Sequence, residues 1–174
     1  FTTGKDGLIT ALELCQTISP DSNGGCESGV FMDYHYEYNF TDSVDFSDLK
    51  IRTVSEYLHE PCSWVPEQYT NDCYISMPEW WIDVFDKDWT LIGELCAEIE
   101  VESQSHTCFV SVGTLGSARL KFDLGEIKNM CSSMPNSSAQ DACFLGAARV
   151  SLPATADYIV GDQICKLMVD NTKE

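Results

Sequence analysis

The hydrophobic pattern begins with one helical stretch. Leu8, Leu12 and Cys15 recur at the spacing that places side chains on one face of a helix. A turn-forming run from Pro20 to Gly25 follows them. This part of the sequence predicts a short N-terminal helix that ends in a turn.

After the turn, apolar and polar residues alternate along residues 32–40, which is typical of a half-buried strand. Tyr34, Tyr36 and Tyr38 would lie on its apolar face, and Asn39 would lie on its polar face. Three tyrosines on one face form a candidate platform for a ligand. The alternative is that they line the core.

A second alternating pattern predicts an antiparallel hairpin. Residues 80–85 form one arm, Asp86 to Asp88 form the turn, and residues 89–101 form the other arm. The outer face of the second arm is lined with glutamates, which makes it the most promising contact surface of the chain. These residues are Glu94, Glu98, Glu100 and Glu102.

Several shorter segments also read as strands, and residues 138–147 fit either a helix or a strand. The sequence therefore predicts a mainly β chain. We expect residues 1–174 to form a single-domain antiparallel β-sandwich or barrel-like fold with the short N-terminal helix. The shorter candidate strands are 49–58, 109–112, 118–124, 156–160 and 164–169.

The nine cysteines predict a disulfide-stabilised protein in an oxidising compartment. Metal ligation is the competing explanation, but it usually needs close pairs, and at least ten residues separate any two cysteines here. Because nine is an odd number, at least one cysteine is free, modified or bonded to another chain. The candidates for disulfides are Cys15, Cys26, Cys62, Cys73, Cys96, Cys108, Cys131, Cys143 and Cys165.

The cysteine spacing is regular. A cysteine that precedes an aromatic and an aliphatic residue recurs at positions 73, 108 and 143, in steps of 35 residues. Cysteines at 62, 96, 131 and 165 follow nearly the same step. The segment from 62 to 165 could thus consist of cysteine-bounded units of about 35 residues. Accidental spacing is the equal alternative, because the residues between the cysteines match poorly.

Composition and sequons indicate the compartment in which the protein is expected. A hydrophobic fraction of 44% favours a folded chain, and no apolar run is long enough to span a bilayer. Asn39 and Asn136 each begin an N-glycosylation sequon. Together with the cysteines, these features predict a secreted, extracellular glycoprotein.

The formal charge of −18 narrows the choice of partners. It argues against nucleic acid, whose phosphates need a basic face. It favours a cationic partner such as a basic protein, whereas the aromatic strands would suit an amphipathic ligand. The alternative for the charge is a solvated surface without a partner.

The sequence carries no signature of a catalytic site or cofactor. It lacks a nucleophile elbow, a zinc-protease helix and a glycine-rich phosphate loop. Asp6 to Glu13 resembles the second half of an EF-hand calcium loop, but Gly4 offers no side-chain oxygen at an expected ligand position, so we expect a plain helix and no metal site.

We therefore expect a non-enzymatic binding or recognition protein. The first alternative is a structural subunit of an extracellular assembly, joined into an oligomer through the odd cysteine. The second alternative is a secreted hydrolase that uses paired carboxylates.

Overall fold

The computed structural model describes residues 5–18, 25–40, 58–156 and 158–171, and the side chains of all of these except 36–40 and 169–171. Every regular element in these residues is an α-helix, and none is a strand. The predicted β-sandwich or barrel is therefore wrong. The helices are α1 (Lys5–Ile18), α2 (Gly25–Phe40), α5 (Glu67–Val84), α6 (Trp89–Ala97), α7 (Glu102–Arg119), α8 (Leu124–Ser132), α9 (Ser137–Thr155) and α10 (Tyr158–Asn171).

The predicted strands are replaced by helices. Only the N-terminal helix, α1, was expected as such, and it buries Leu8, Leu12 and Cys15 as the spacing requires. Residues 32–40 belong to α2, and residues 138–147 belong to α9. Of the predicted hairpin, residues 80–84 belong to α5, residues 89–97 belong to α6, and residues 98–101 form the connection to α7. Residues 109–112 and most of 118–124 fall in α7 and the turn after it, and 158–160 and 164–169 fall in α10. Of the predicted strand 49–58, only Leu58 lies within the described residues.

The chain divides into two compact units, residues 1–80 and 81–174. The division falls inside α5, at Trp80. The expectation of a single domain is not tested by this division and stays a prediction.

Two helices of the second unit show why these residues form helices. In α6 and just after it, Ile92, Leu95, Cys96 and Ile99 are buried. These positions are 0, 3, 4 and 7, the stripe that a helix presents to a core. The same spacing of buried residues recurs 35 positions later at Ile127, Met130, Cys131 and Met134, in and just after α8.

The turns before α6 and α8 also match. Each contains two consecutive residues with positive φ, namely 46° and 63° at Asp86 and Lys87, and 53° and 60° at Lys121 and Phe122. An aspartate then caps the helix: Asp88 accepts a hydrogen bond from the Leu91 amide at 3.1 Å, and Asp123 accepts one from the Glu126 amide at 3.0 Å.

Four disulfides, all with partners 11 or 12 residues apart, clamp neighbouring segments of the chain. Three of them join the end of one helix to the early turns of the next: α1 to α2, α6 to α7, and α8 to α9. The fourth joins the turn before α5 to α5 itself. The predicted disulfide bonding is confirmed. The pairs are Cys15–Cys26, Cys62–Cys73, Cys96–Cys108 and Cys131–Cys143, and Cys165 is free and exposed.

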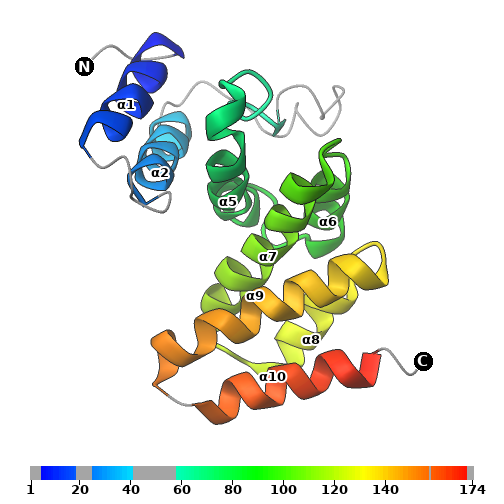
Figure 1. Cartoon of the computed structure of the whole chain (residues 1–174). Helices are drawn as coiled ribbons and strands as arrows, with labels where there is room; N and C mark the ends of the chain where they lie inside the picture. The colour runs from blue at the N-terminus through cyan, green and yellow to red at the C-terminus, as the bar shows by residue number, and fades with distance from the viewer. Residues whose placement is uncertain (1–4, 19–24, 41–57, 157, 172–174) are drawn as a thin grey trace. The chain divides into compact units, whose positions relative to one another are not determined.

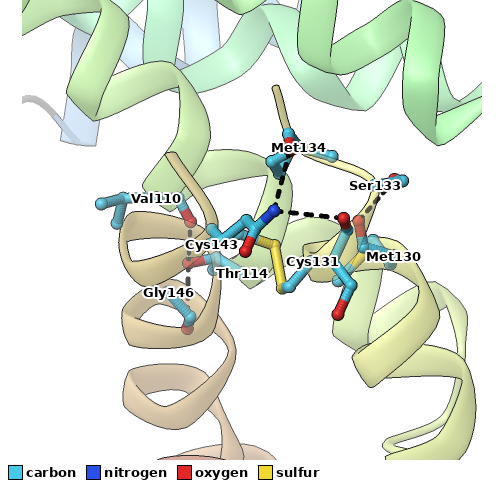
Figure 2. The surroundings of a disulfide bond; sticks show 10 residues. Val110, Thr114, Met130, Cys131, Ser133, Met134, Cys143 and Gly146 are labelled. Atoms are coloured by element: carbon cyan, nitrogen blue, oxygen red, sulfur yellow. Dashed lines mark hydrogen bonds between the residues drawn. A yellow bond between two sulfur atoms is a disulfide. The ribbon is translucent and has the colours of Figure 1, made fainter. Parts of the chain in front are cut away.

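In the second unit, α7 and α9 pack side by side and α10 packs along α9 (Figure 1). The helices α7 and α9 are antiparallel, because Gly113 faces the backbone of Cys143 while Gly146 faces that of Val110. The Thr114 hydroxyl bridges the two helices, donating to the carbonyl of Val110 at 3.0 Å and lying 3.3 Å from that of Gly146 (Figure 2).

In the first unit, α1 packs against α2, and α2 contacts α5. The Ser76 hydroxyl of α5 lies 3.4 Å from the Ser28 carbonyl of α2. Seven residues further along α2 and four residues further along α5, the His35 ring stacks on the Trp80 ring, with 5.7 Å between centroids. Residue numbers therefore increase in the same direction along both helices, so α2 and this part of α5 are parallel.

Candidate functional site

The four glutamates singled out in the sequence gather at the connection between α6 and α7. Glu94 lies in α6, Glu98 is its C-cap, Glu100 lies in the turn and Glu102 is the first residue of α7. All four side chains are exposed. The expectation that they line one face of a strand is wrong, because these residues form a helix end and a turn. We call these four glutamates the acidic turn.

The acidic turn is held by bonds on both sides. The Cys96–Cys108 disulfide joins α6 to α7 with 5.6 Å between its Cα atoms. The Ser105 hydroxyl of α7 donates a hydrogen bond to the Cys96 carbonyl at 2.8 Å. Ile99 is buried between two of the glutamates in sequence, with 8% of its surface exposed. A buried anchor between exposed neighbours fixes which way the turn faces.

Local electrostatics add to the negative charge of the acidic turn. The C-terminal end of a helix carries a partial negative charge from its aligned peptide dipoles, and Glu94 and Glu98 lie at that end of α6. No lysine or arginine occurs from residue 88 to residue 118. Arg119, the next cation, is paired with Asp83 at 3.0 Å. The acidic turn is therefore a site of concentrated negative potential.

The predicted tyrosine platform does not form on one face. Tyr34, Tyr36 and Tyr38 all belong to α2. A helix rotates about 100° per residue, so position 36 lies on the opposite side from positions 34 and 38. The Tyr34 side chain is half-buried and meets the Trp64 ring edge-on at 6.4 Å, while the side chains at 36 and 38 lie outside the described residues.

The two sequons differ in what the structure describes. Asn136 is exposed and caps α9 by accepting a hydrogen bond from the Ala139 amide at 3.0 Å through its side-chain oxygen. That bond involves the side-chain oxygen and not the side-chain nitrogen, the atom that carries an N-linked glycan. Asn39 falls in α2, where its side chain lies outside the described residues. Glycosylation at either position stays a prediction.

A buried histidine, His35, lies between α2 and α5 and was missed by sequence reasoning. The alternation predicted for residues 32–40 puts position 35, like Asn39, on the polar face of a strand. The side chain is only 6% exposed and stacks on Trp80 with 12° between the ring planes. Its Nε2 atom is buried without a hydrogen-bond partner. Burial lowers the pKa of His35 from its ordinary value of 6.5 to about 4. The spacing of Glu27, Phe31 and His35 at i, i+4 and i+8 was the available signal of a buried helical face.

Two carboxyls approach each other across the same helices. Burial, and secondly the charge of Glu27, raise the pKa of Asp72 on α5 above its ordinary value. Such a pair is the electrostatic feature expected of an acid–base hydrolase. Glu27 is only 8% exposed and its Oε2 atom has no hydrogen-bond partner. Because a substrate has little access to Glu27, we assign no catalytic role to these two residues.

The described ranges hold no group of three His, Cys, Asp or Glu side chains that could bind a metal ion. In the same ranges, no helix combines the length and the apolarity needed to cross a bilayer. No protein-family model, no curated protein and no solved structure matches this chain. The function is therefore argued from the residues of the chain alone.

Proposed function

We propose that this chain is a secreted, non-enzymatic binding protein that engages a cationic protein partner through the acidic turn. The observation that carries the proposal is the set of four exposed carboxylates on one disulfide-clamped connection, in a stretch of 31 positions, 88–118, without lysine or arginine. A fixed surface of this kind attracts a basic partner and loses little conformational entropy on binding.

The number of disulfides supports the proposal of a secreted protein. Eight of nine cysteines form disulfides in a chain of 174 residues, which suits an oxidising compartment. The amphipathic-ligand version of the proposal loses its main support, because the three tyrosines do not share a face of α2.

The test compares two variants that remove the same charge. The first carries Glu→Gln at all four positions of the acidic turn. The control removes four exposed carboxylates elsewhere, with Glu13→Gln, Asp33→Asn, Glu67→Gln and Glu126→Gln. Each removes four negative charges and so changes the formal charge from −18 to −14. Binding of poly-L-lysine, the cationic probe, is measured by calorimetry at about 50 mM and about 500 mM salt.

We expect the acidic-turn variant to bind the probe about tenfold more weakly than the wild type, and the control to stay within about threefold of it. Equal weakening of both variants would show that overall charge, and not this turn, attracts the cation. Wild-type affinity that stays constant between the two salt concentrations would refute a charge-driven interaction altogether.

A second candidate function, a structural subunit of an extracellular assembly, is favoured by one specific observation. Cys165 is the eighth residue of α10, just as Cys96 and Cys131 are the eighth residues of α6 and α8. Those two cysteines are fully buried in disulfides, whereas Cys165 is an exposed thiol. Tyr158 lies seven residues before Cys165, on the same face of α10, and is 75% exposed. An interchain disulfide at Cys165 would supply the link of such an assembly.

Electrophoresis without and with reductant tests this second candidate. The assembly predicts a band above the monomer in the absence of reductant, and its loss in the Cys165→Ser variant. A monomer band in both lanes for the wild type would remove the covalent link.

A further inference from the structure

The first unit contains two disulfide-clamped pairs of segments. Cys15–Cys26 holds α1 to α2, and Cys62–Cys73 holds residues 58–66 to α5. No disulfide joins one pair to the other, since the remaining two bonds lie in the second unit. The two pairs are therefore held against each other by noncovalent contacts only.

Most of the contacts that the structure describes between the two pairs involve aromatic rings. His35 stacks on Trp80, and Tyr34 meets the edge of Trp64. The Lys5 ammonium of α1 lies 4.6 Å from the centre of the Trp64 ring. The hydrogen bond from Ser76 to the Ser28 carbonyl is long, at 3.4 Å. We call this set of contacts between α1–α2 and residues 58–80 the joint.

His35 is the group of the joint whose protonation the structure accommodates worst. The ring is 6% exposed and lies nearly parallel to that of Trp80. Its unpartnered Nε2 has no acceptor to which an imidazolium could donate. A buried charge without a partner is strongly unfavourable, so the neutral ring is the form that fits.

The described charged groups around α2 do not offset the cost of placing a charge on His35. Burial is the cause of the lowered pKa of His35, and no carboxylate of the described residues is found to offset it. The Glu27–Asp72 pair lies at the other end of the interface, near the Ser28–Ser76 contact. The described charged or titratable side chains on the elements packed around α2 are Lys5, Asp6 and Glu13 on α1, Glu27, Asp33 and Tyr34 on α2 itself, His59 and Glu60 before α5, and Glu67, Tyr69, Asp72, Tyr74 and Glu79 on α5.

We propose that the joint is an acid-sensitive device: protonation of His35 releases the α1–α2 pair from α5 and exposes the apolar faces that now meet between them. Phe31, which is fully buried, and Trp80, which is 7% exposed, would become accessible in the released form. This device would let an acidic environment expose or withdraw a hydrophobic surface, independently of the acidic turn in the other unit.

The direction with pH follows from linkage. Burial holds the pKa of His35 at about 4 in the closed form, and it returns to 6.5 when the joint opens. The closed form is thus favoured at neutral pH and loses that advantage as the pH falls from 6.5 towards 4. Between pH 7 and pH 4.5 the opening equilibrium constant rises about 60-fold from this one proton. Asp72 acts in the opposite direction, because burial and, secondly, the charge of Glu27 raise its pKa, so protonation of Asp72 favours the closed form.

Hydrogen exchange of the full chain, read by mass spectrometry, tests the device. Exchange of the α2 amides is measured at pH 7 and pH 4.5 and corrected for the intrinsic rate with an unstructured peptide. His35→Phe keeps a flat ring for Trp80 but cannot take up a proton. His106→Gln, at an exposed position in α7, is the matched control.

We expect corrected α2 exchange to rise at pH 4.5 by tens of fold in the wild type and in His106→Gln, and to rise much less in His35→Phe. The same rise in all three proteins would overturn the proposal. If His35→Phe does not fold, proton NMR of the wild-type imidazole decides the question. A ring that stays neutral at pH 5 supports the device, and one that titrates near 6.5 refutes it.

Discussion

The contact between α7 and α9 allows a sharp prediction about glycine. A Cβ atom added at Gly113 would lie 1.9 Å from the Cys143 carbonyl oxygen, and one added at Gly146 would lie 1.9 Å from that of Val110. Both obstacles are backbone atoms inside helices, so neither can rotate away. We expect Gly113→Ala and Gly146→Ala each to destabilise the second unit.

The size of the effect follows from that geometry. Contacts between carbon and oxygen shorter than about 3.3 Å are rare, so the helices must separate by more than about 1 Å. Overpacking of this kind costs about 1–3 kcal/mol, and separation also weakens the bridge from Thr114 to Gly146. The higher helix propensity of alanine offsets up to about 1 kcal/mol of this cost. The net expectation is a loss of about 2 kcal/mol for each variant.

Thermal unfolding followed by circular dichroism measures this loss. For a chain of this length, about 2 kcal/mol corresponds to a fall in Tm of roughly 4–8 °C. Gly29→Ala is the matched control, because Gly29 lies inside α2 and an added Cβ there meets nothing within 4 Å. That control should raise the free energy of unfolding by up to about 1 kcal/mol.

The two obstructed glycines also make a test of coupling. They act on the same pair of helices, so separation forced by the first alanine relieves the second. The double variant should therefore lose clearly less than the sum of the single losses. Single variants as stable as the wild type would show that α7 and α9 do not approach as closely as described, and the reasoning would fail.

Three further predictions rest on local contacts. Replacing Cys131 and Cys143 together by serine should lower the free energy of unfolding by about 3 kcal/mol, as judged by denaturant titration, because the disulfide closes a loop and so restricts the unfolded chain. Asp72→Asn should stabilise the chain at pH 7 by less than about 1 kcal/mol, since it removes a carboxylate that burial and, secondly, the charge of Glu27 disfavour, and the gain should vanish in denaturant titrations at low pH as the wild-type carboxyl takes up its proton. Asp123→Ala should cost about 1 kcal/mol in thermal unfolding through loss of the α8 cap, and an unchanged Tm would remove that role.

The presence of disulfide bonds was predicted from the sequence more accurately than the fold was. The number and spacing of the cysteines correctly indicated disulfides, and the spacing of Leu8, Leu12 and Cys15 correctly indicated α1. Which cysteines pair could not be read from the spacing, because several pairings are compatible with it. In the structure, each pair spans the short connection between one helical segment and the next.

The strands were predicted wrongly because short apolar runs fit more than one period. In residues 32–40 the tyrosines alternate, but among the described side chains 31–35 the buried ones are Phe31 and His35, four residues apart. Packing against α1 and α5 decided which face is buried, and alternation in the sequence did not. Two local signals did favour helices: apolar residues four before, one before and three after Cys96 and Cys131, and capping aspartates.

The chain contains its own comparison for the acidic turn. The connection between α8 and α9 repeats the connection between α6 and α7, with a disulfide of the same 12-residue separation. At the positions 35 residues after the four glutamates, however, the residues are neutral: Asn129, Ser133, Pro135 and Ser137. The scaffold is thus shared by both connections, whereas the concentrated charge belongs to one of them.

This difference permits a transfer experiment. In the background that has glutamine at all four positions of the acidic turn, we expect Asn129→Glu, Ser133→Glu and Ser137→Glu together to restore most of the binding of poly-L-lysine. The reason is that the new carboxylates would lie on an equally clamped turn, at the C-terminal end of α8. Calorimetry at low salt measures the affinity. Restored binding would show that clamped negative charge is sufficient for recognition, whereas a folded variant that still binds weakly would show that the neighbours of the original turn contribute contacts that charge alone does not supply.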